Sequence, residues 1–232
     1  MILKNVIYNT TFRITEDNMV EVTNKDLKGG AKKYITFDDL INAITSSVES
    51  ERDVIKFNTP ILPHDNNNKV STILYHELSN NKYVIFLKRE KDNVDFDYGD
   101  KIYENVGIPR LVFAIKVFNN SVLQTKVVAI KDKIVTENTA IYCYPFSNVY
   151  SDGNVCWGGV QLPAFDNAIS LKSMPDIFLS SPSNNHLYGK NLSSLEYRPL
   201  LEELSNREFK DEYLSPMGKV TFKSWVDRFS KE

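Results

Sequence analysis

Four runs of β-branched and aromatic residues follow one another between residues 70 and 130, separated by polar segments. The runs are Val70–Leu78, Tyr83–Lys88, Val112–Phe118 and Val127–Ile130. Such residues fit a pleated, half-buried surface, and short polar connections favour strands that pair with their sequence neighbours. The pattern therefore predicts a four-stranded antiparallel meander.

The connection between the second and third runs is longer and acidic. It extends from Asp92 to Pro109, and its carboxylates are Asp92, Asp95, Asp97, Asp100 and Glu104. Segments that connect strands usually run over the surface and are polar. We expect an exposed loop or insertion here, with an interaction surface as the alternative.

The residues before the meander predict a hairpin and a helix. Leu3–Tyr8 and Met19–Thr23 have strand character, and the basic segment 28–33 links this pair to the helical pattern after it. In residues 37–50 apolar side chains recur at helical spacing, and Thr36 is a suitable N-cap. This order predicts an N-terminal β-hairpin followed by an amphipathic helix.

Helical patterns return in the second half of the chain. Residues 165–179 predict a helix that is interrupted near Pro175, because proline is tolerated in the first turn of a helix but not in its interior. Segments 195–208 and 220–229 also carry apolar residues at helical spacing. Together with the meander, these helices indicate the α+β class.

Composition restricts the class of protein. A chain of 232 residues that is 42% hydrophobic can bury a sizeable core, and a net charge of −2 gives no general positive field for nucleic acid. No apolar run approaches the roughly 20 residues of a membrane helix, and the first residues lack the layout of a signal peptide. We expect a cytoplasmic protein with no membrane partner and no nucleic-acid partner.

Cysteine and histidine are too sparse for a metal centre or a disulfide framework. The two cysteines are Cys143 and Cys156, and neither His64 nor His76 has a companion at ligand spacing. We therefore expect no metal, and we assign Cys143, in an alternating aromatic strand, to packing or to a strand face.

The segment from Tyr144 to Gly159 is the strongest candidate for chemistry. Asn148 stands eight positions before Cys156, and the intervening Ser-Asp-Gly-Asn sequence is typical of a tight turn. If the chain reverses there, the amide of Asn148 and the thiol of Cys156 lie on two arms of one loop. A fixed amide donor beside a reacting carbonyl can stabilise the negative charge that develops on its oxygen.

Residues Asn148 to Cys156 resemble the active-site segment of the ubiquitin-conjugating (UBC) superfamily. The superfamily pattern is His-Pro-Asn, a glycine-containing turn, an aliphatic residue and the acceptor cysteine. Asn148, Gly153, Val155 and Cys156 match it, whereas Phe and Ser occupy positions 146 and 147, where His and Pro would stand.

This departure resembles prokaryotic family D of the superfamily, the group that includes the PRTRC system protein B. In that group the usual histidine is missing and another histidine follows the cysteine. His186 fits this description, and the resemblance covers roughly residues 70–190.

The resemblance implies an α+β fold of UBC type. Its expected parts are an antiparallel meander with a flanking N-terminal helix and a C-terminal crossover helix, in addition to the N-terminal hairpin. The expected organisation is a hairpin extension and linker at 1–33, a UBC-like domain at 34–190 and a helical tail at 191–232.

The resemblance also implies a reaction and its partners. A ThiF-like activating enzyme, which would use the ATP, would load a ubiquitin-like modifier onto Cys156 as a thioester. The amine of a target protein, a lysine, would then attack while Asn148 steadies the oxyanion. The chain would thus be a transferase that itself needs no cofactor.

Each site residue also has a purely structural interpretation. Cys156 could be a small buried hydrophobe, and Asn148 could bond the turn backbone. His186 could be an exposed loop residue or a proton acceptor near the thiol, and Asp152 could form the turn or orient an incoming amine.

Two other functions remain open from the sequence. The chain could be a catalytically inactive UBC-like module that holds a modifier or its activator, because a fold does not determine an activity. It could also be a scaffold of a plasmid or phage accessory system in which the thiol has no role.

Overall fold

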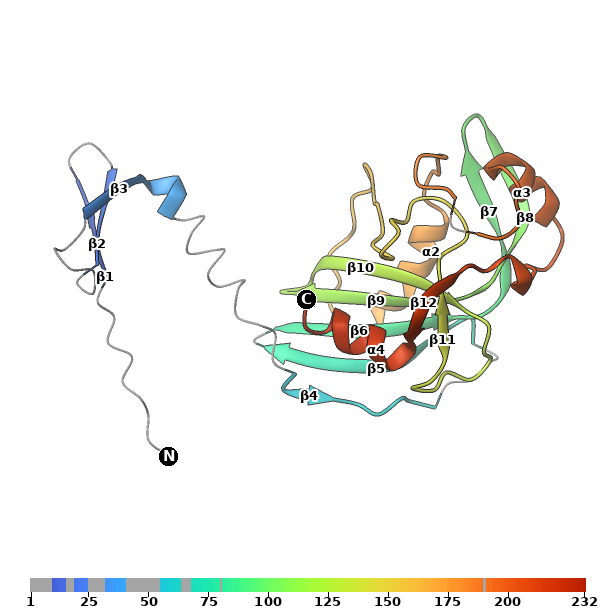
Figure 1. Cartoon of the computed structure of the whole chain (residues 1–232), viewed down its shortest axis with the longest axis horizontal. Helices are drawn as coiled ribbons and strands as arrows, with labels where there is room; N and C mark the ends of the chain where they lie inside the picture. Colours follow the sequence, from blue (N-terminus) through green and yellow to red (C-terminus); the bar gives the residue numbers. More distant parts are fainter. Residues whose placement is uncertain are drawn as a thin grey trace. The chain divides into compact units, whose positions relative to one another are not determined.

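The structure is a computed structural model, and it describes residues 10–15, 19–24, 32–40, 55–63, 68–79, 81–189 and 191–232 (Figure 1). The chain divides into two compact units, Met1–Arg52 and Asp53–Glu232.

A three-stranded antiparallel sheet forms the first unit. Its strands are β1 (Thr10–Ile14), β2 (Met19–Asn24) and β3 (Lys32–Thr36), in that order. The predicted strand at 19–23 is confirmed as β2. Its partner in the hairpin is β1, whereas the predicted strand at 3–8 lies outside the described residues. The prediction of a link at 28–33 is wrong at its end, because β3 begins at Lys32.

Thr36 begins a helix as predicted. Its Oγ1 accepts a hydrogen bond from the backbone N–H of Asp39 at 3.1 Å, which satisfies one of the free donors of the first turn. Residues 37–40 are helical, and the rest of the predicted helix, 41–50, lies outside the described residues.

A seven-stranded antiparallel sheet organises the second unit, in the order β12-β11-β10-β9-β6-β5-β4. The four predicted strands are confirmed as its centre. The strands are β4 (Phe57–Asn58), β5 (Val70–Ser79), β6 (Lys82–Arg89), β9 (Arg110–Phe118), β10 (Ser121–Ile130), β11 (Ala140–Tyr142) and β12 (Pro216–Thr221).

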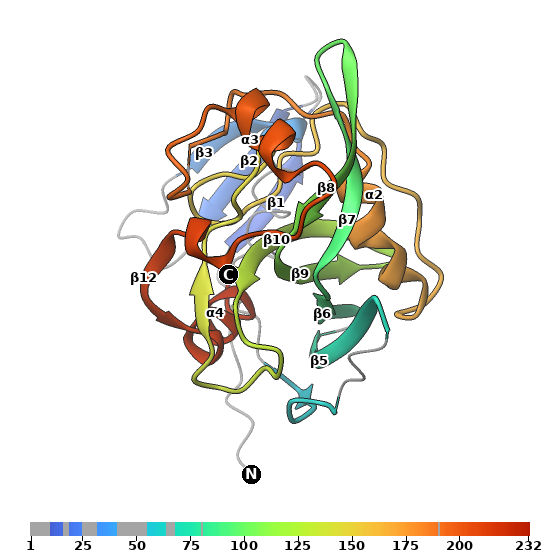
Figure 2. The ribbon, with the colours of Figure 1, turned by 90° about the vertical axis from the view of Figure 1, so that its right-hand side faces the viewer.

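The acidic segment between β6 and β9 forms a second hairpin, so of the two predicted alternatives the insertion is found and the loop is wrong. Its strands β7 (Asp92–Tyr98) and β8 (Lys101–Ile108) pair with each other in a separate two-stranded sheet. Exposed carboxylates alternate along β7 with inward-facing residues such as the buried Phe96. The hairpin extends away from the main sheet beside α3 (Figure 2).

Three helices follow the main part of the sheet. They are α2 (Met174–Leu179), which a 3-10 turn at Ser170–Ser173 precedes, α3 (Tyr197–Leu204) and α4 (Phe222–Phe229). Pro175 lies in the first turn of α2, as predicted. The predicted helix at 195–208 is shorter than expected, and α4 confirms the predicted last amphipathic helix.

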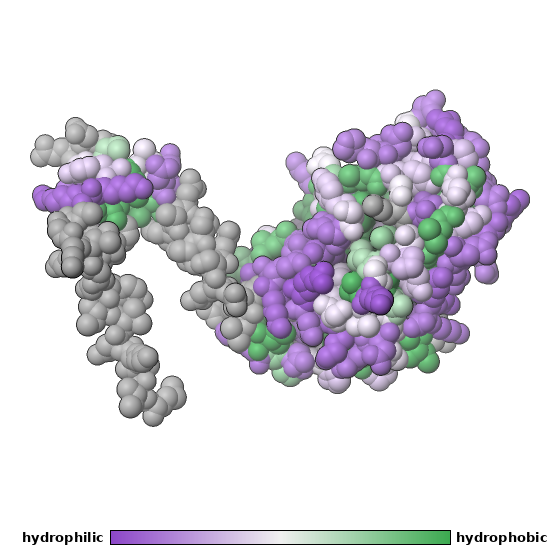
Figure 3. Space-filling view, in the orientation of Figure 1, coloured by the Kyte–Doolittle hydropathy of each residue, from purple (hydrophilic) through white to green (hydrophobic). Residues whose placement is uncertain are grey.

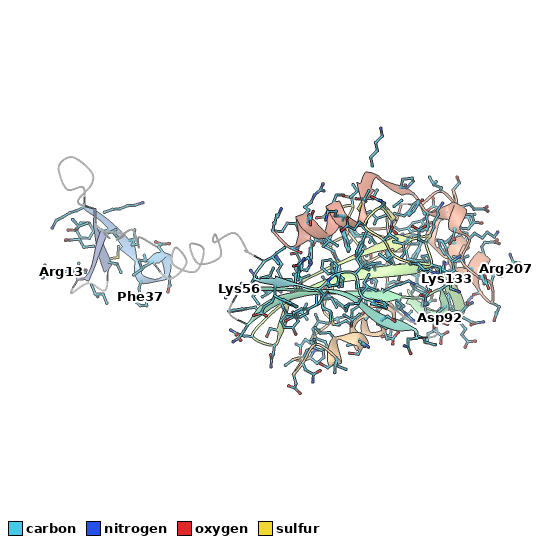
Figure 4. All side chains as sticks on the ribbon, turned by 90° about the horizontal axis from the view of Figure 1, so that it is seen from below. Arg13, Phe37, Lys56, Asp92, Lys133 and Arg207 are labelled. Carbon is cyan, nitrogen blue, oxygen red and sulfur yellow. The ribbon has the colours of Figure 1, made fainter. Side chains whose placement is uncertain are left out.

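The sheet has a hydrophobic core on each face, because buried side chains alternate along its central strands. On β6, Ile85 and Leu87 join a cluster that includes residues of α2 and α3, whereas Val84 and Phe86 join a cluster that includes α4. Side chains fill the whole unit from Lys56 at one end to Asp92 and Arg207 at the other (Figure 4). The second unit is therefore of the α+β class.

Close packing between β8 and the segment after α3 predicts a strong effect at Gly107. A Cβ atom added there would lie 2.2 Å from the backbone oxygen of Arg207 and 2.7 Å from the backbone nitrogen of Phe209. Since backbone atoms cannot move aside cheaply, Gly107→Ala should lower the free energy of unfolding by about 1–3 kcal/mol or more. Gly159→Ala is the matched control, because a Cβ there meets nothing within 4 Å. Urea unfolding measures both, and equal midpoints would contradict this packing.

A buried histidine predicts that the protein loses stability in acid. His76 is 4% exposed, and its Nδ1 lies 2.8 Å from Ser230 Oγ on the segment after α4. Burial lowers the pKa of His76 below 6.5, and the charge of Asp227 opposes this shift only in part. The unfolded chain therefore binds more protons in mild acid, so this contribution to stability is complete above pH 6.5 and is lost as pH falls. Urea unfolding between about pH 5 and pH 8 should show a weaker pH dependence for His76→Gln than for the wild type; equal slopes would contradict it.

Candidate functional site

A short hairpin, residues 148–156, carries the candidate thiol, and we term it the thiol hairpin. Backbone hydrogen bonds join its arms, from Cys156 N–H to the carbonyl of Asn148 at 2.8 Å and from Tyr150 N–H to the carbonyl of Asn154 at 2.9 Å. The chain reversal expected from the turn sequence is present. Asn148 and Cys156 therefore lie opposite each other on the two arms.

Gly153 allows the thiol hairpin to turn tightly against the sheet. Its φ is +87°, and a Cβ atom there would lie 3.2 Å from the carbonyl oxygen of Val127. The second arm continues the sheet, because Val127 N–H donates to Gly153 O at 2.8 Å and Val155 N–H donates to Thr125 O at 2.9 Å. The thiol thus sits on a segment that the edge of β10 holds in place.

Asp152 closes the turn with its side chain. Its carboxylate accepts hydrogen bonds from the backbone N–H of Asn154, at 3.0 Å, and from the Asn154 side-chain amide. This arrangement serves the turn, and Asp152 remains exposed. Its predicted role in orienting an amine stays a prediction.

Tyr150 is a neighbour of the thiol that sequence reasoning missed. In an antiparallel hairpin, residues 148, 150, 154 and 156 share one face, and a long side chain reaches the diagonal position on the opposite arm. A hydrogen bond between the side chains of Tyr150 and Cys156 raises the pKa of Tyr150 above 10, with a further charge interaction from Cys156 and a smaller effect of desolvation. The half-buried Cys156 thiol therefore has a polar neighbour on its own hairpin.

The side chain of Asn148 bonds a second loop in this structure. Asn148 has φ +66°, a conformation that asparagine tolerates better than most residues. Its Nδ2 donates to the carbonyl oxygen of Pro182 at 2.9 Å. The amide thus ties the thiol hairpin to the loop at residues 180–189, and its proposed oxyanion role is a separate function that stays a prediction.

The loop at residues 180–189 is also anchored to β7. Ser183 donates to the carbonyl of Asp97 through both its backbone N–H and its hydroxyl, each at 2.8 Å. Tyr197 at the start of α3 is 2% exposed, and this burial raises its pKa. The hairpin that was predicted as a loop therefore supports the candidate site.

His186 lies on the same loop, four residues beyond Pro182. It is exposed, and its backbone N–H donates to the side-chain oxygen of Asn184 at 2.8 Å. Among the described residues, no hydrogen bond or ion pair joins its ring to Cys156. A role for His186 as proton acceptor or orienting donor stays a prediction.

Phe146, which stands where a histidine was expected, is part of an aromatic cluster. It is 2% exposed, and its ring lies 4.8 Å from that of Phe96 on β7, with Tyr144 and Phe209 nearby. Trp157, which follows the thiol, packs edge-on against Phe178 of α2. Aromatic packing on both sides therefore fixes the ends of the thiol hairpin.

A depression of about 730 Å³ lies beside the thiol hairpin. It is bounded by β10 and by the hairpin, and both neighbours of the thiol, Val155 and Trp157, line it. A bulge in β10 occurs between Val122 and Gln124, and the intervening Leu123 is 53% exposed in the wall of the depression. Bulges of this kind re-aim a side chain and are frequent next to functional sites.

Neither metal ligation nor a membrane segment is evident in the part of the chain that the structure describes. Within those residues, no three His, Cys, Asp or Glu side chains are grouped so that they could hold a metal ion. No described helix combines the length and the apolar character needed to cross a membrane.

The contact between Tyr150 and Cys156 predicts a change in a titration. The largest contributions to the raised pKa of Tyr150 come from Cys156. Cys156→Ala should therefore return that pKa toward 10. NMR titration of the tyrosine ring carbons in both proteins measures this shift. Cys143→Ala is the control and should leave the pKa of Tyr150 where it is in the wild type; a Tyr150 pKa insensitive to Cys156→Ala would contradict the contact.

Comparison with known proteins places the chain in a family. No curated protein and no solved structure gives a match to the chain. The family model of prokaryotic E2 family D matches residues 63–217, which is more than half of the chain and includes the whole thiol hairpin. The chain therefore belongs to prokaryotic E2 family D, a family related to the ubiquitin-conjugating enzymes.

Proposed function

We propose that the protein carries a ubiquitin-like modifier as a thioester on Cys156 and transfers it to an amine. The observation that carries this proposal is the thiol hairpin: a half-buried thiol beside the Tyr150 hydroxyl and opposite Asn148, in a chain of prokaryotic E2 family D. Its partners would be a modifier, a ThiF-like activating enzyme and a target protein with an acceptor lysine.

The proposed reaction has two acyl transfers. The Cys156 thiolate attacks the thioester between the modifier and the activating enzyme, a new C–S bond forms, and the thiolate of the activating enzyme leaves. The neutral amine of the target then attacks the carbonyl carbon on Cys156. The tetrahedral intermediate collapses to an amide, the Cys156 thiolate leaves, and the amine loses a proton to a base. A fixed donor beside the oxyanion lowers the barrier of this second transfer.

Residues of the chain could serve the second transfer, the discharge to the amine. The amide of Asn148 would reach the oxyanion after it exchanges its bond to the Pro182 carbonyl for one to the intermediate. The depression that Val155 and Trp157 line lies next to the residues on either side of Cys156, and it would receive part of the modifier or of the target. His186 would act as proton acceptor or orienting donor, and Asp152 would orient the amine.

The finer assignment of the fold belongs to the same proposal. Strands β6, β9, β10 and their neighbours would form the UBC meander, and α2 would be the crossover helix. Residues 34–190 would be the UBC-like domain, between an extension at 1–33 and a tail at 191–232. The relation to the PRTRC system protein B and a cytoplasmic location are further parts of this proposal.

The experiment that tests the function is a loading assay. The protein is incubated with a candidate ThiF-like activating enzyme, a small modifier with a diglycine end and ATP, and the products are separated without reductant. An adduct that disappears on treatment with a thiol reductant supports the proposal. If the activating enzyme is visibly charged with the modifier and no adduct forms on this protein, thioester transfer is refuted.

Two observations favour a second candidate, a catalytically inactive module that holds a modifier or its activator. The side-chain amide of Asn148 is engaged with Pro182, and a buried aromatic residue takes the place of the histidine of the superfamily pattern. Such a module would bind the charged activating enzyme without forming the adduct, which the same assay shows when binding is measured in parallel.

A further inference from the structure

A second depression touches the tip of the thiol hairpin. Its volume is about 270 Å³, and Ser151 and Asp152 line both it and the depression beside the thiol. Its other walls come from β10, β12 and α4. The residues that α4 contributes lie beyond residue 217, where the match to the family ends, so the family resemblance does not account for them.

A buried ammonium group forms the polar end of this depression. Lys126 on β10 is 6% exposed, and its Nζ lies 2.6 Å from a carboxylate oxygen of Glu232 and 5.6 Å from the ring centroid of Phe229. A cation buried to this extent requires an anionic partner. The partner is a side chain that is itself 34% exposed and follows the end of α4. The structure thus shows that Lys126 pairs with a carboxylate and that this carboxylate belongs to a partly exposed side chain.

A second donor in the same walls has no acceptor. Trp225 on α4 is 4% exposed and lines the depression, and its indole N–H is buried without a hydrogen-bond partner among the described residues. Buried donors are paired in most proteins, and an unpaired one is costly. Arg228, exposed on the same helix, adds a guanidinium group to the walls. Arg228 is therefore the donor that stays accessible to a ligand, whereas the indole N–H of Trp225 is buried in the wall.

We propose that this depression binds a small apolar monocarboxylate, whose carboxylate takes the place of that of Glu232 on Lys126. Two cations, Lys126 and Arg228, and two carboxylates, Asp152 and Glu232, line the site. Exchange of one carboxylate for another keeps that balance, whereas a phosphate dianion would add negative charge near Asp152. The walls also contain the apolar side chains of Met217, Val220 and Phe229. These side chains suit the apolar part of such a ligand.

Of the residues that line the site, Ser151 and Asp152 belong to the thiol hairpin. None of its cationic or aromatic residues belongs to the thiol hairpin, so ligand binding and modifier loading can be measured separately. The face that carries α4 is mostly hydrophilic, with smaller hydrophobic areas between the polar residues (Figure 3).

Benzoate is a suitable probe, and benzamide, which has nearly the same shape without the charge, is its matched control. The full chain labelled with ¹⁵N should show an indole N–H signal from each tryptophan, and Trp157→Phe assigns the signal of Trp225. Benzoate should move the Trp225 signal in a saturable way, and benzamide should leave it in place. Glu232→Gln should bind benzoate about tenfold more tightly because it removes the internal competitor, and Lys126→Met should bind it at least tenfold more weakly.

Several results would overturn the proposal. Equal shifts with benzoate and benzamide, or no shift of the Trp225 signal at saturating benzoate, would show that no carboxylate site exists there. An unchanged benzoate affinity in Glu232→Gln would show that Glu232 does not occupy the site. If Lys126→Met fails to fold, two measurements still decide the question. They are the comparison of benzoate with benzamide on the wild type and the affinity of Glu232→Gln for benzoate.

Discussion

Cys156→Ala is expected to abolish the reductant-sensitive adduct completely. The adduct requires a sulfur that can attack a thioester carbonyl, and alanine provides no nucleophile. The loading assay with activating enzyme, modifier and ATP measures this loss directly. The chain supplies its own control, because Cys143 is the other cysteine and is similarly half-buried.

Cys143→Ala should load like the wild type. Cys143 lies just beyond β11, where its backbone N–H donates to the carbonyl of Ser215, and it is outside the thiol hairpin. Cys156→Ser sharpens the comparison, since any adduct on a serine oxygen is an ester that thiol reductants do not cleave. An adduct that persists unchanged in Cys156→Ala, or that vanishes in Cys143→Ala, would show that Cys156 is not the acceptor thiol.

Asn148→Gly is expected to load the modifier and to discharge it about 10²–10³-fold more slowly, the usual cost of losing one oxyanion donor. Glycine is the appropriate replacement because Asn148 has φ +66°, where alanine would add backbone strain to the loss of the amide. Single-turnover discharge to free lysine, followed from the preloaded thioester, isolates the step. Asn120→Gly is the control, since Asn120 has φ +65° in the turn between β9 and β10, away from the thiol hairpin.

The structural role of Asn148 is separable from this catalytic role. Loss of its bond to Pro182 should loosen the loop at residues 180–189, which hydrogen exchange at the backbone of Ser183 and its neighbours reports. If Asn148→Gly discharges as fast as the wild type while this loop exchanges faster, the amide holds the loop and does not stabilise the oxyanion.

Local sequence patterns were sufficient to predict the central strands and the turn of the thiol hairpin. The runs of β-branched and aromatic residues became β5, β6, β9 and β10, because burial on both faces of the sheet selects such residues. The reversal before Cys156 followed from Asp152 and Gly153, whose backbone preferences act within a few residues.

The elements that were missed have signals that compete with strand formation. The carboxylates along β7 and β8 concealed the strand pattern of this hairpin in the sequence. The buried residues Phe96 and Tyr103, which pair across the hairpin, are the signal of strand formation that remained. Strand β12 begins with proline and contains Gly218, both of which are unfavourable in strands. Tertiary pairing with β11 overrides that preference.

The sequence of the candidate site does not predict its contacts with distant segments of the chain. The bond from Asn148 to Pro182 joins residues 34 positions apart, and nothing local to either residue predicts it. Tyr150 was within reach of prediction, since it shares a hairpin face with Cys156 once the turn is placed. Whether His186 serves the thiol depends on the loop that carries it, and this stays a prediction.

The proposed function requires an acyl bond to one sulfur, and mapping that bond is its most direct test. The loaded protein, kept free of reductant and digested at mildly acidic pH, should give by tandem mass spectrometry a peptide in which the C-terminal residue of the modifier is attached to Cys156. A modifier attached at Cys143 or on a lysine of this chain, or an unmodified Cys156 peptide from protein incubated with charged activating enzyme, would contradict it.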